Sequence, residues 1–290
     1  MLASSVSIDT LIHLSNTNPA IFVATPINKC GLSPKSTAFV NRWLDATKAN
    51  LFFAKGVVLV EGIAKAMLLP VFAKSILMEY NSGKQDSEKL SESLEDGGVS
   101  VINMNGIYFE HFMQLFCDLG EDKFNDIPIR CSGITDNDPP KEENPTPKVK
   151  VNGNNSALGL IDKINQCLID KINQSSQARL FSNELKTFEY DLAMEGENLK
   201  GMSKVLKELI KTDGSIKATL EKYEEINWRD EESENLKALS SRYILDHIES
   251  KGYYAQVLAC NIEEGKINIQ IPRYLVNAII WASGGELNES

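Results

Sequence analysis

Residues 50–70 read NLFFAKGVVLVEGIAKAMLLP, and this stretch decides the fold class of the 290-residue chain. The hydrophobic, mostly β-branched run Val57–Val60 predicts a β-strand. The strand leads directly into Glu61 and Gly62, after which apolar residues recur about every 3.6 positions and predict a helix packed on a sheet. A carboxylate between a strand and a helix stands where α/β proteins place their functional residues.

The segments around this stretch continue the alternation of predicted strands and helices. Residues 36–54 have helical spacing, Val99–Met104 predicts a second strand, and residues 107–119 predict its following helix. Residues 127–138 predict a third strand that ends in acidic residues, and the polar residues 139–155 predict a loop. The order strand, helix, strand, helix, strand predicts an α/β fold with a largely parallel sheet and flanking helices.

The rest of the chain divides by composition. We predict an α/β core over residues 37–194 and a helical insertion or arm over residues 195–265. Residues 266–290 are expected to complete the core with a short strand beginning at Ile267 and a closing helix that starts at a proline. Residues 1–36 contain one short apolar segment among turn residues and are predicted to be an N-terminal extension.

Charge and cysteine content exclude several classes of protein. The formal net charge is −10, with 40 acidic and 30 basic residues, so the surface as a whole is not suited to hold nucleic acid by counterion release. A phosphate-bearing partner would need a local basic patch, divalent metal or another subunit. The cysteines form no Cys-x-x-Cys pair, which argues against a disulfide framework or structural zinc site and favours a reducing compartment.

The chain is expected to be cytoplasmic and to have no membrane partner. Its N-terminus has no basic region followed by a long apolar one, as a secretory signal would. The apolar run at residues 63–78 is interrupted by Lys65, Pro70 and Lys74 and is too short and too charged to span a bilayer.

Three carboxylates are predicted to meet at the carboxyl edge of the sheet. Glu61 follows the first strand, and Asp136 and Asp138 follow the third. An oxygen cluster of this kind suits a hard cation such as Mg²⁺. Two other interpretations stay open: TDNDPP is also a turn sequence, and a carboxylate before a helix is favoured by the helix dipole without any ligand.

Several segments resemble a known family. LFFAKGVVLVEG followed by ITDND looks like the TOPRIM domain of topoisomerases, bacterial primases and a set of nucleases. FFAKGVVLVEG, GIYFEHFMQLF, TFEYDLA and KGYYAQVLA together resemble the C-terminal half of the overcoming lysogenization defect (OLD) family. These ATP-dependent endonucleases include the nuclease subunit of the Gabija phage-defence system. The resemblance covers roughly residues 36–285, and its motifs occur in the expected order.

The resemblance implies a TOPRIM fold and a set of site residues. It makes Glu61, Asp136, Asp138 and Glu189 ligands of Mg²⁺ or Mn²⁺, and it makes Lys251 a lysine that faces the scissile phosphate. Glu61, Asp136 and Lys251 are the expected catalytic residues. Without the family, Glu189 would be interpreted as a helix-surface acid and Lys251 as a cation at the end of a helix.

One position departs from the family pattern. The family sequence after the strand is usually V-E-G-x-x-E, whereas this chain has VEGIAK with Lys65 in place of the second acid. Glu61 and Lys65 lie about one helical turn apart and can pair. Three consequences are open: Lys65 points to solvent while Glu110 or Glu189 completes the second site, Lys65 replaces one metal by a fixed charge, or the site is inactive.

The function implied by the resemblance is that of a metal-dependent DNA endonuclease in anti-phage defence. In the family an ATPase domain precedes the TOPRIM domain, so residues 1–36 are interpreted as a remnant of it or as an extension. No G-x-x-x-x-G-K-[ST] motif occurs, so an ATPase domain or subunit, DNA and a second copy of the chain are the expected partners. The alternative is a TOPRIM-like scaffold of an ATPase complex. A primase-like or topoisomerase-like function is not favoured, because no zinc spacing is present and the chain is too short for an appended DNA-gate domain with a catalytic tyrosine.

Overall fold

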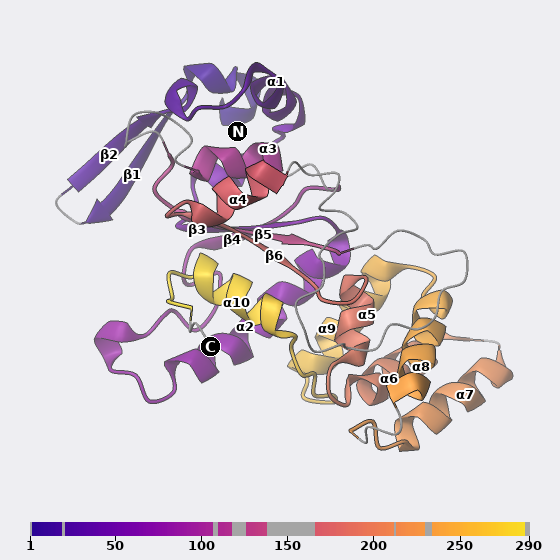
Figure 1. Cartoon of the computed structure of the whole chain (residues 1–290). Coiled ribbons are helices and arrows are strands. Elements are labelled where there is room, and N and C mark those ends of the chain that lie inside the picture. The colour runs from indigo at the N-terminus through magenta and orange to yellow at the C-terminus, as the bar shows by residue number, and fades with distance from the viewer. Residues whose placement is uncertain are drawn as a thin grey trace.

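The computed structural model describes residues 2–18, 21–106, 110–117, 126–137, 166–211, 213–229 and 234–287. Its centre is a four-stranded, fully parallel sheet with the order β4-β3-β5-β6 (Figure 1). The strands are β3 (Gly56–Val60), β4 (Val99–Asn103), β5 (Arg130–Thr135) and β6 (Ala178–Ser182). The predicted α/β class and parallel sheet are confirmed, while the sequence analysis did not foresee β6.

Strand β3 is hydrophobic throughout because helices cover both faces of the sheet. On one face, Val57 and Leu59 pack in a cluster that includes residues of α1 (Pro34–Trp43), α3 (Glu110–Met113) and α4 (Gln166–Gln174). On the other face, Val58 and Val60 pack against α2 (Ile63–Asn81) and α10 (Arg273–Ala282). The central strand thus presents its carboxyl end, and Glu61, at a fixed edge between two packed layers.

The remaining helices gather beside the carboxyl edge of the sheet (Figure 1). They are α5 (Phe188–Met194), α6 (Asn198–Leu209), α7 (Gly214–Glu225), α8 (Glu234–His247) and α9 (Lys251–Glu263). Helix α9 packs along α2, which ties this helical part to the core. The proposed domain boundaries at residues 36, 194 and 265 stay predictions. Within the described ranges, no helix is both long and apolar enough to cross a membrane.

An antiparallel hairpin precedes the core. It consists of β1 (Ile12–Asn18) and β2 (Ile21–Pro26) and projects from the body (Figure 1). The turn residues in this region hid both strands from sequence analysis. Short 3₁₀ segments complete the described elements, at Leu2–Ser5, Ile8–Thr10, Ile27–Lys29, Lys48–Phe52, Asp86–Glu88 and Gln114–Phe116.

Two predicted elements are wrong. The helix predicted over residues 36–54 ends at Trp43, because the Asp45 carboxylate accepts the backbone N–H groups of Thr47 and Lys48 and starts a separate turn. The strand predicted from Ile267 does not form. The backbone of Gln270 there bonds the side chain of Asn198 instead of a neighbouring strand. The predicted loop 139–155 lies outside the described residues.

Candidate active site

Glu61 and Asp136 meet at the carboxyl edge of the sheet. They follow the neighbouring strands β3 and β5, in which Val60 is paired with Ile134. The backbone N–H of Asp136 donates to both Glu61 carboxylate oxygens at 3.3 Å, and the Thr135 hydroxyl donates to one of them. Parallel pairing therefore brings two residues 75 positions apart in sequence into one hydrogen-bonded unit.

Lys65 points into this unit. It lies in the first turn of α2, and its Nζ is 2.8 Å from Asp136 Oδ1 and 3.4 Å from Glu61 Oε2. Burial alone would lower the pKa of Lys65, but the charges of Asp136 and Glu61 outweigh burial and raise it, so the ammonium stays protonated. Only 3% of Lys65 is exposed, so the hypothesis that Lys65 points to solvent is wrong.

Asp136 is held by donors from two different helices. Burial raises its pKa to about 6, against the opposing effect of the Lys65 charge, and the Glu61 charge adds to the increase. Besides Lys65, its Oδ1 accepts the backbone N–H of Phe188 at 3.0 Å. Asp136 is therefore ionised at neutral pH and is held by both α2 and the start of α5.

Glu189 and Lys251 form a second ion pair of 3.0 Å. Glu189 lies in α5 and is buried, so it is not the helix-surface acid of the alternative interpretation. Lys251 is the first residue of α9, after the N-cap Ser250, and does not end a helix. Its side chain is 60% exposed, so the ammonium can reach a ligand in solvent while it remains beside Glu189.

The described acids carry little uncompensated charge for a metal ion. Among the described residues, no group of three or more His, Cys, Asp or Glu side chains is placed to hold a metal. Glu61, Asp136 and Glu189 are accompanied by the ammonium groups of Lys65 and Lys251, which leaves one negative charge in excess. One oxygen each of Asp136 and Glu189 makes no hydrogen bond within the described part of the chain. The remaining predicted ligand, Asp138, lies outside the described residues.

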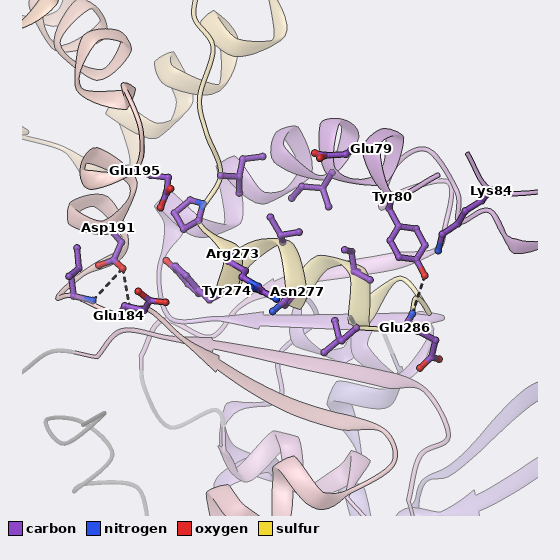
Figure 2. Close-up of a pocket in the computed structure, with 17 residues that line it drawn as sticks. Glu79, Tyr80, Lys84, Glu184, Asp191, Glu195, Arg273, Tyr274, Asn277 and Glu286 are labelled. Atoms are coloured by element: carbon purple, nitrogen blue, oxygen red, sulfur yellow. Dashed lines mark hydrogen bonds between the residues drawn. The ribbon is translucent and has the colours of Figure 1, made fainter. Parts of the chain in front are cut away.

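A pocket of about 760 Å³ is lined by residues of α2, α5 and α10 (Figure 2). Asp191 and Tyr274 line it, whereas Glu61, Asp136 and Lys251 do not. The pKa of Tyr274 is raised well above its usual value by burial and then by the charges of Asp191, Asp136, Glu189 and Glu61. Tyr274 is therefore close enough to the carboxylates of the site to feel their charge, although the site residues do not line the pocket.

Sequence reasoning missed the groups that hold the acids in place. The Thr135 hydroxyl and the Phe188 N–H contact Glu61 and Asp136 directly. A weak signal existed for α5, because Thr187 before an acidic first turn is typical of a helix start and places the Phe188 N–H at a helix N-terminus. Nothing in the sequence indicated that this start would meet Asp136.

Comparisons with known proteins identify a related domain and similar folds. Residues 52–138 match the family model described as Overcoming lysogenization defect protein-like, TOPRIM domain. The solved C-terminal region of the Burkholderia pseudomallei OLD protein aligns with a TM-score of 0.52 and 20% identity over 80% of this chain and 98% of that chain. The C-terminal region of the Xanthomonas campestris pv. campestris OLD protein aligns with a TM-score of 0.46 and 20% identity over 80% of this chain and 95% of that chain. No curated protein matches the chain.

The parallel sheet with acidic residues at its carboxyl edge is a fold of the TOPRIM class. Residues 52–138 form, more narrowly, an OLD-like TOPRIM domain, which confirms the resemblance seen in the sequence. The matched range contains Glu61, Lys65 and Asp136, whereas Glu189 and Lys251 lie beyond it. The match supports a nuclease-type function, and the structural similarity, at 20% identity, shows the fold alone.

Proposed function

We propose that this chain is a DNA endonuclease of the OLD type that uses one Mg²⁺ or Mn²⁺ ion, with Lys65 supplying a fixed positive charge in place of a second ion. The observation that carries the proposal is the position of Lys65 Nζ between Glu61 and Asp136. A buried ammonium there neutralises part of a carboxylate cluster that would otherwise be strongly self-repelling.

The remaining acids would hold the ion. Asp136 and Glu189 each retain an oxygen for it, and Asp138 is the third ligand implied by the family. A divalent ion bound to phosphodiester substrates activates the attacking water and stabilises the leaving oxygen. The hard-oxygen donor set favours Mg²⁺ or Mn²⁺ over softer metals.

Lys251 and Lys65 would have different tasks. Lys251 is exposed beside Glu189 and is suited to contact a phosphate oxygen, where a cation offsets the charge that develops during hydrolysis. Lys65 is buried and holds Glu61 and Asp136 in place without reaching solvent. Because the chain has a net charge of −10, we also propose that DNA binding depends on the metal ion, on an ATPase domain or subunit and on self-association. Anti-phage defence in the cytoplasm is the role that the family implies.

Cleavage of supercoiled plasmid tests the proposal. The purified chain would be incubated with Mg²⁺, Mn²⁺ or EDTA, alone and with any ATPase encoded beside it. Asp136→Asn should abolish metal-dependent nicking or linearisation, whereas Asp246→Asn, at an exposed surface pair, should leave it unchanged. Cleavage that persists in EDTA or in Asp136→Asn would contradict the proposed site.

A second function is favoured by the same lysine. The ion pairs of Lys65 make the acid cluster self-sufficient, as expected for a TOPRIM-like scaffold that assembles an ATPase complex without cutting DNA. A folded chain that forms a stable complex with the ATPase, binds no Mn²⁺ by calorimetry and cleaves no DNA would support this alternative.

A further inference from the structure

Asp191 is a buried carboxylate whose partners all come from the segment before its own helix. It lies in α5, and its oxygens accept the backbone N–H groups of Glu184, Leu185 and Lys186 at 3.1–3.3 Å. The side-chain amide of Asn183 donates to the same carboxylate at 3.3 Å. Figure 2 shows Asp191 turned toward the backbone near Glu184. These four donors fix the loop between β6 and α5.

Both ends of this loop contact the acid site, which is the cluster of Glu61, Lys65 and Asp136, or the residue next to it. At one end, Asn183 Oδ1 accepts the backbone N–H of Asn137, the residue after Asp136. At the other end, the backbone N–H of Phe188 donates to Asp136 Oδ1. The orientation of the Asn183 amide follows from its neighbours, because its nitrogen needs an acceptor, which is Asp191, and its oxygen needs a donor, which is Asn137.

We infer that Asp191 is a positioning residue for the acid site, which holds Asp136 against Lys65 by way of Asn183 and the loop 184–187. Asp191 itself has no contact with Glu61, Lys65 or Asp136 among the bonds of the described residues. Through hydrogen bonds its effect is therefore indirect: it orders Phe188, whose backbone N–H holds the Asp136 side chain, and Asn183, which holds the backbone of Asn137. The inference rests on the proposed function only where it concerns cleavage.

A double substitution that exchanges the side chains of residues 183 and 191 distinguishes a positioning role of Asp191 from a general contribution to the stability of the fold. Asp191→Asn keeps the shape but replaces one accepting oxygen by an NH₂ group, so either the donors of Asn183 and Lys186 or those of Glu184 and Leu185 lose their acceptor. In the double variant Asn183→Asp with Asp191→Asn, the new amide at 191 donates to the new carboxylate at 183, which still accepts the Asn137 N–H. The double variant therefore restores the hydrogen bond between positions 183 and 191, although the Lys186 N–H that shared the same Asp191 oxygen does not regain its acceptor. Asp246→Asn serves as a matched surface control.

Amide hydrogen exchange measured by NMR on the full chain reports the connection without any need for catalysis. We expect the amides of Asn137 and Phe188 to exchange at least about tenfold faster in Asp191→Asn, and to return to within about threefold of wild type in the double variant. Unchanged exchange at these two amides in Asp191→Asn would overturn the inference. Faster exchange that the double variant fails to reverse would also overturn it, because the residue would then act only through general stability.

Plasmid cleavage by the same four proteins distinguishes this inference from the proposed function. If the wild type cleaves, Asp191→Asn should lower kcat about tenfold or more with little change in KM, and the double variant should recover most of the rate. If the exchange pattern appears as expected and no protein cleaves under any condition, the positioning role stands and the proposed endonuclease function fails.

Discussion

Lys65 Nζ lies 2.8 Å from Asp136 Oδ1, and this buried ion pair joins the first turn of α2 to the end of β5. The same ammonium is 3.4 Å from Glu61, so one lysine bridges the two acids that follow neighbouring strands. A single side chain thus neutralises part of the charge of the two acids.

Lys65→Met should destabilise the fold. Removal of the ammonium leaves two largely buried carboxylates close together, and loss of one partner of a buried pair costs about 3 kcal/mol or more. Urea unfolding at neutral pH would measure the loss. Lys74→Met is the matched control, because Lys74 pairs with Glu263 at the surface and its loss should cost less than about 1 kcal/mol. Equal effects of the two variants would contradict a central role for Lys65.

Lys65→Glu should make folding depend on divalent ions. Three carboxylates would then crowd one point, so the variant should be less stable than wild type in EDTA and should gain at least about 2 kcal/mol at saturating Mn²⁺. Thermal unfolding with and without Mn²⁺, together with calorimetric titration, would measure the gain. Lys74→Glu should show no such gain in stability. An equal Mn²⁺ response of Lys65→Glu and wild type would argue against the proposal that the Lys65 charge takes the place of a second metal ion.

Lys251→Met should lower the cleavage rate while it changes the stability of the fold only slightly. Its side chain is 60% exposed, so loss of the pair with Glu189 should cost only about 1 kcal/mol. If Lys251 contacts the reacting phosphate, the cleavage rate should fall about 10²-fold. Lys266→Met, at a similarly exposed lysine, should affect neither quantity. A cleavage rate within twofold of wild type would remove Lys251 from the site.

Cysteine labelling should follow burial. Burial raises the pKa of Cys30 and of Cys117 to about 12 and raises that of the fully buried Cys131 well above its usual value, whereas Cys260 is exposed. A thiol reagent at pH 8 should therefore label Cys260 rapidly and the three buried thiols only after unfolding. Peptide mapping after short exposure would check this, and rapid labelling of Cys131 would contradict the packing of β5.

Gly56→Ala should disrupt the start of β3. A Cβ atom at this position would lie 2.0 Å from the backbone oxygen of Ala282 in α10, so strand and helix would have to separate at a cost of about 3 kcal/mol. Gly62→Ala is the control, because nothing lies within 4 Å of a Cβ there. Urea unfolding of both variants would measure the difference. A Gly56→Ala variant as stable as Gly62→Ala would show that α10 does not press on this strand.

The sequence contains strong local evidence for the centre of the fold. Val57–Val60 is continuously apolar because both faces of the strand are covered, and such a run between helical patterns predicts a parallel sheet. Strand β6 carried no comparable signal: its burial is only partial beyond Ala178, and its sequence ARLFS has no sustained alternation. The predicted helix over residues 36–54 failed for a similar reason, since helical spacing did not reveal the local turn at Asp45.

For the site, the sequence by itself determined which acids end the strands, because their place depends only on residues adjacent in the chain. The identity of position 65 as a lysine, and its spacing of four from Glu61, were also readable. Only the tertiary structure decided that Lys65 turns inward to Asp136, that Lys251 begins a helix beside a buried Glu189, and that the loop held by Asp191 reaches the acid site. These contacts join residues 52 to 71 positions apart, and no local propensity encodes which of many polar groups will meet when separate elements pack.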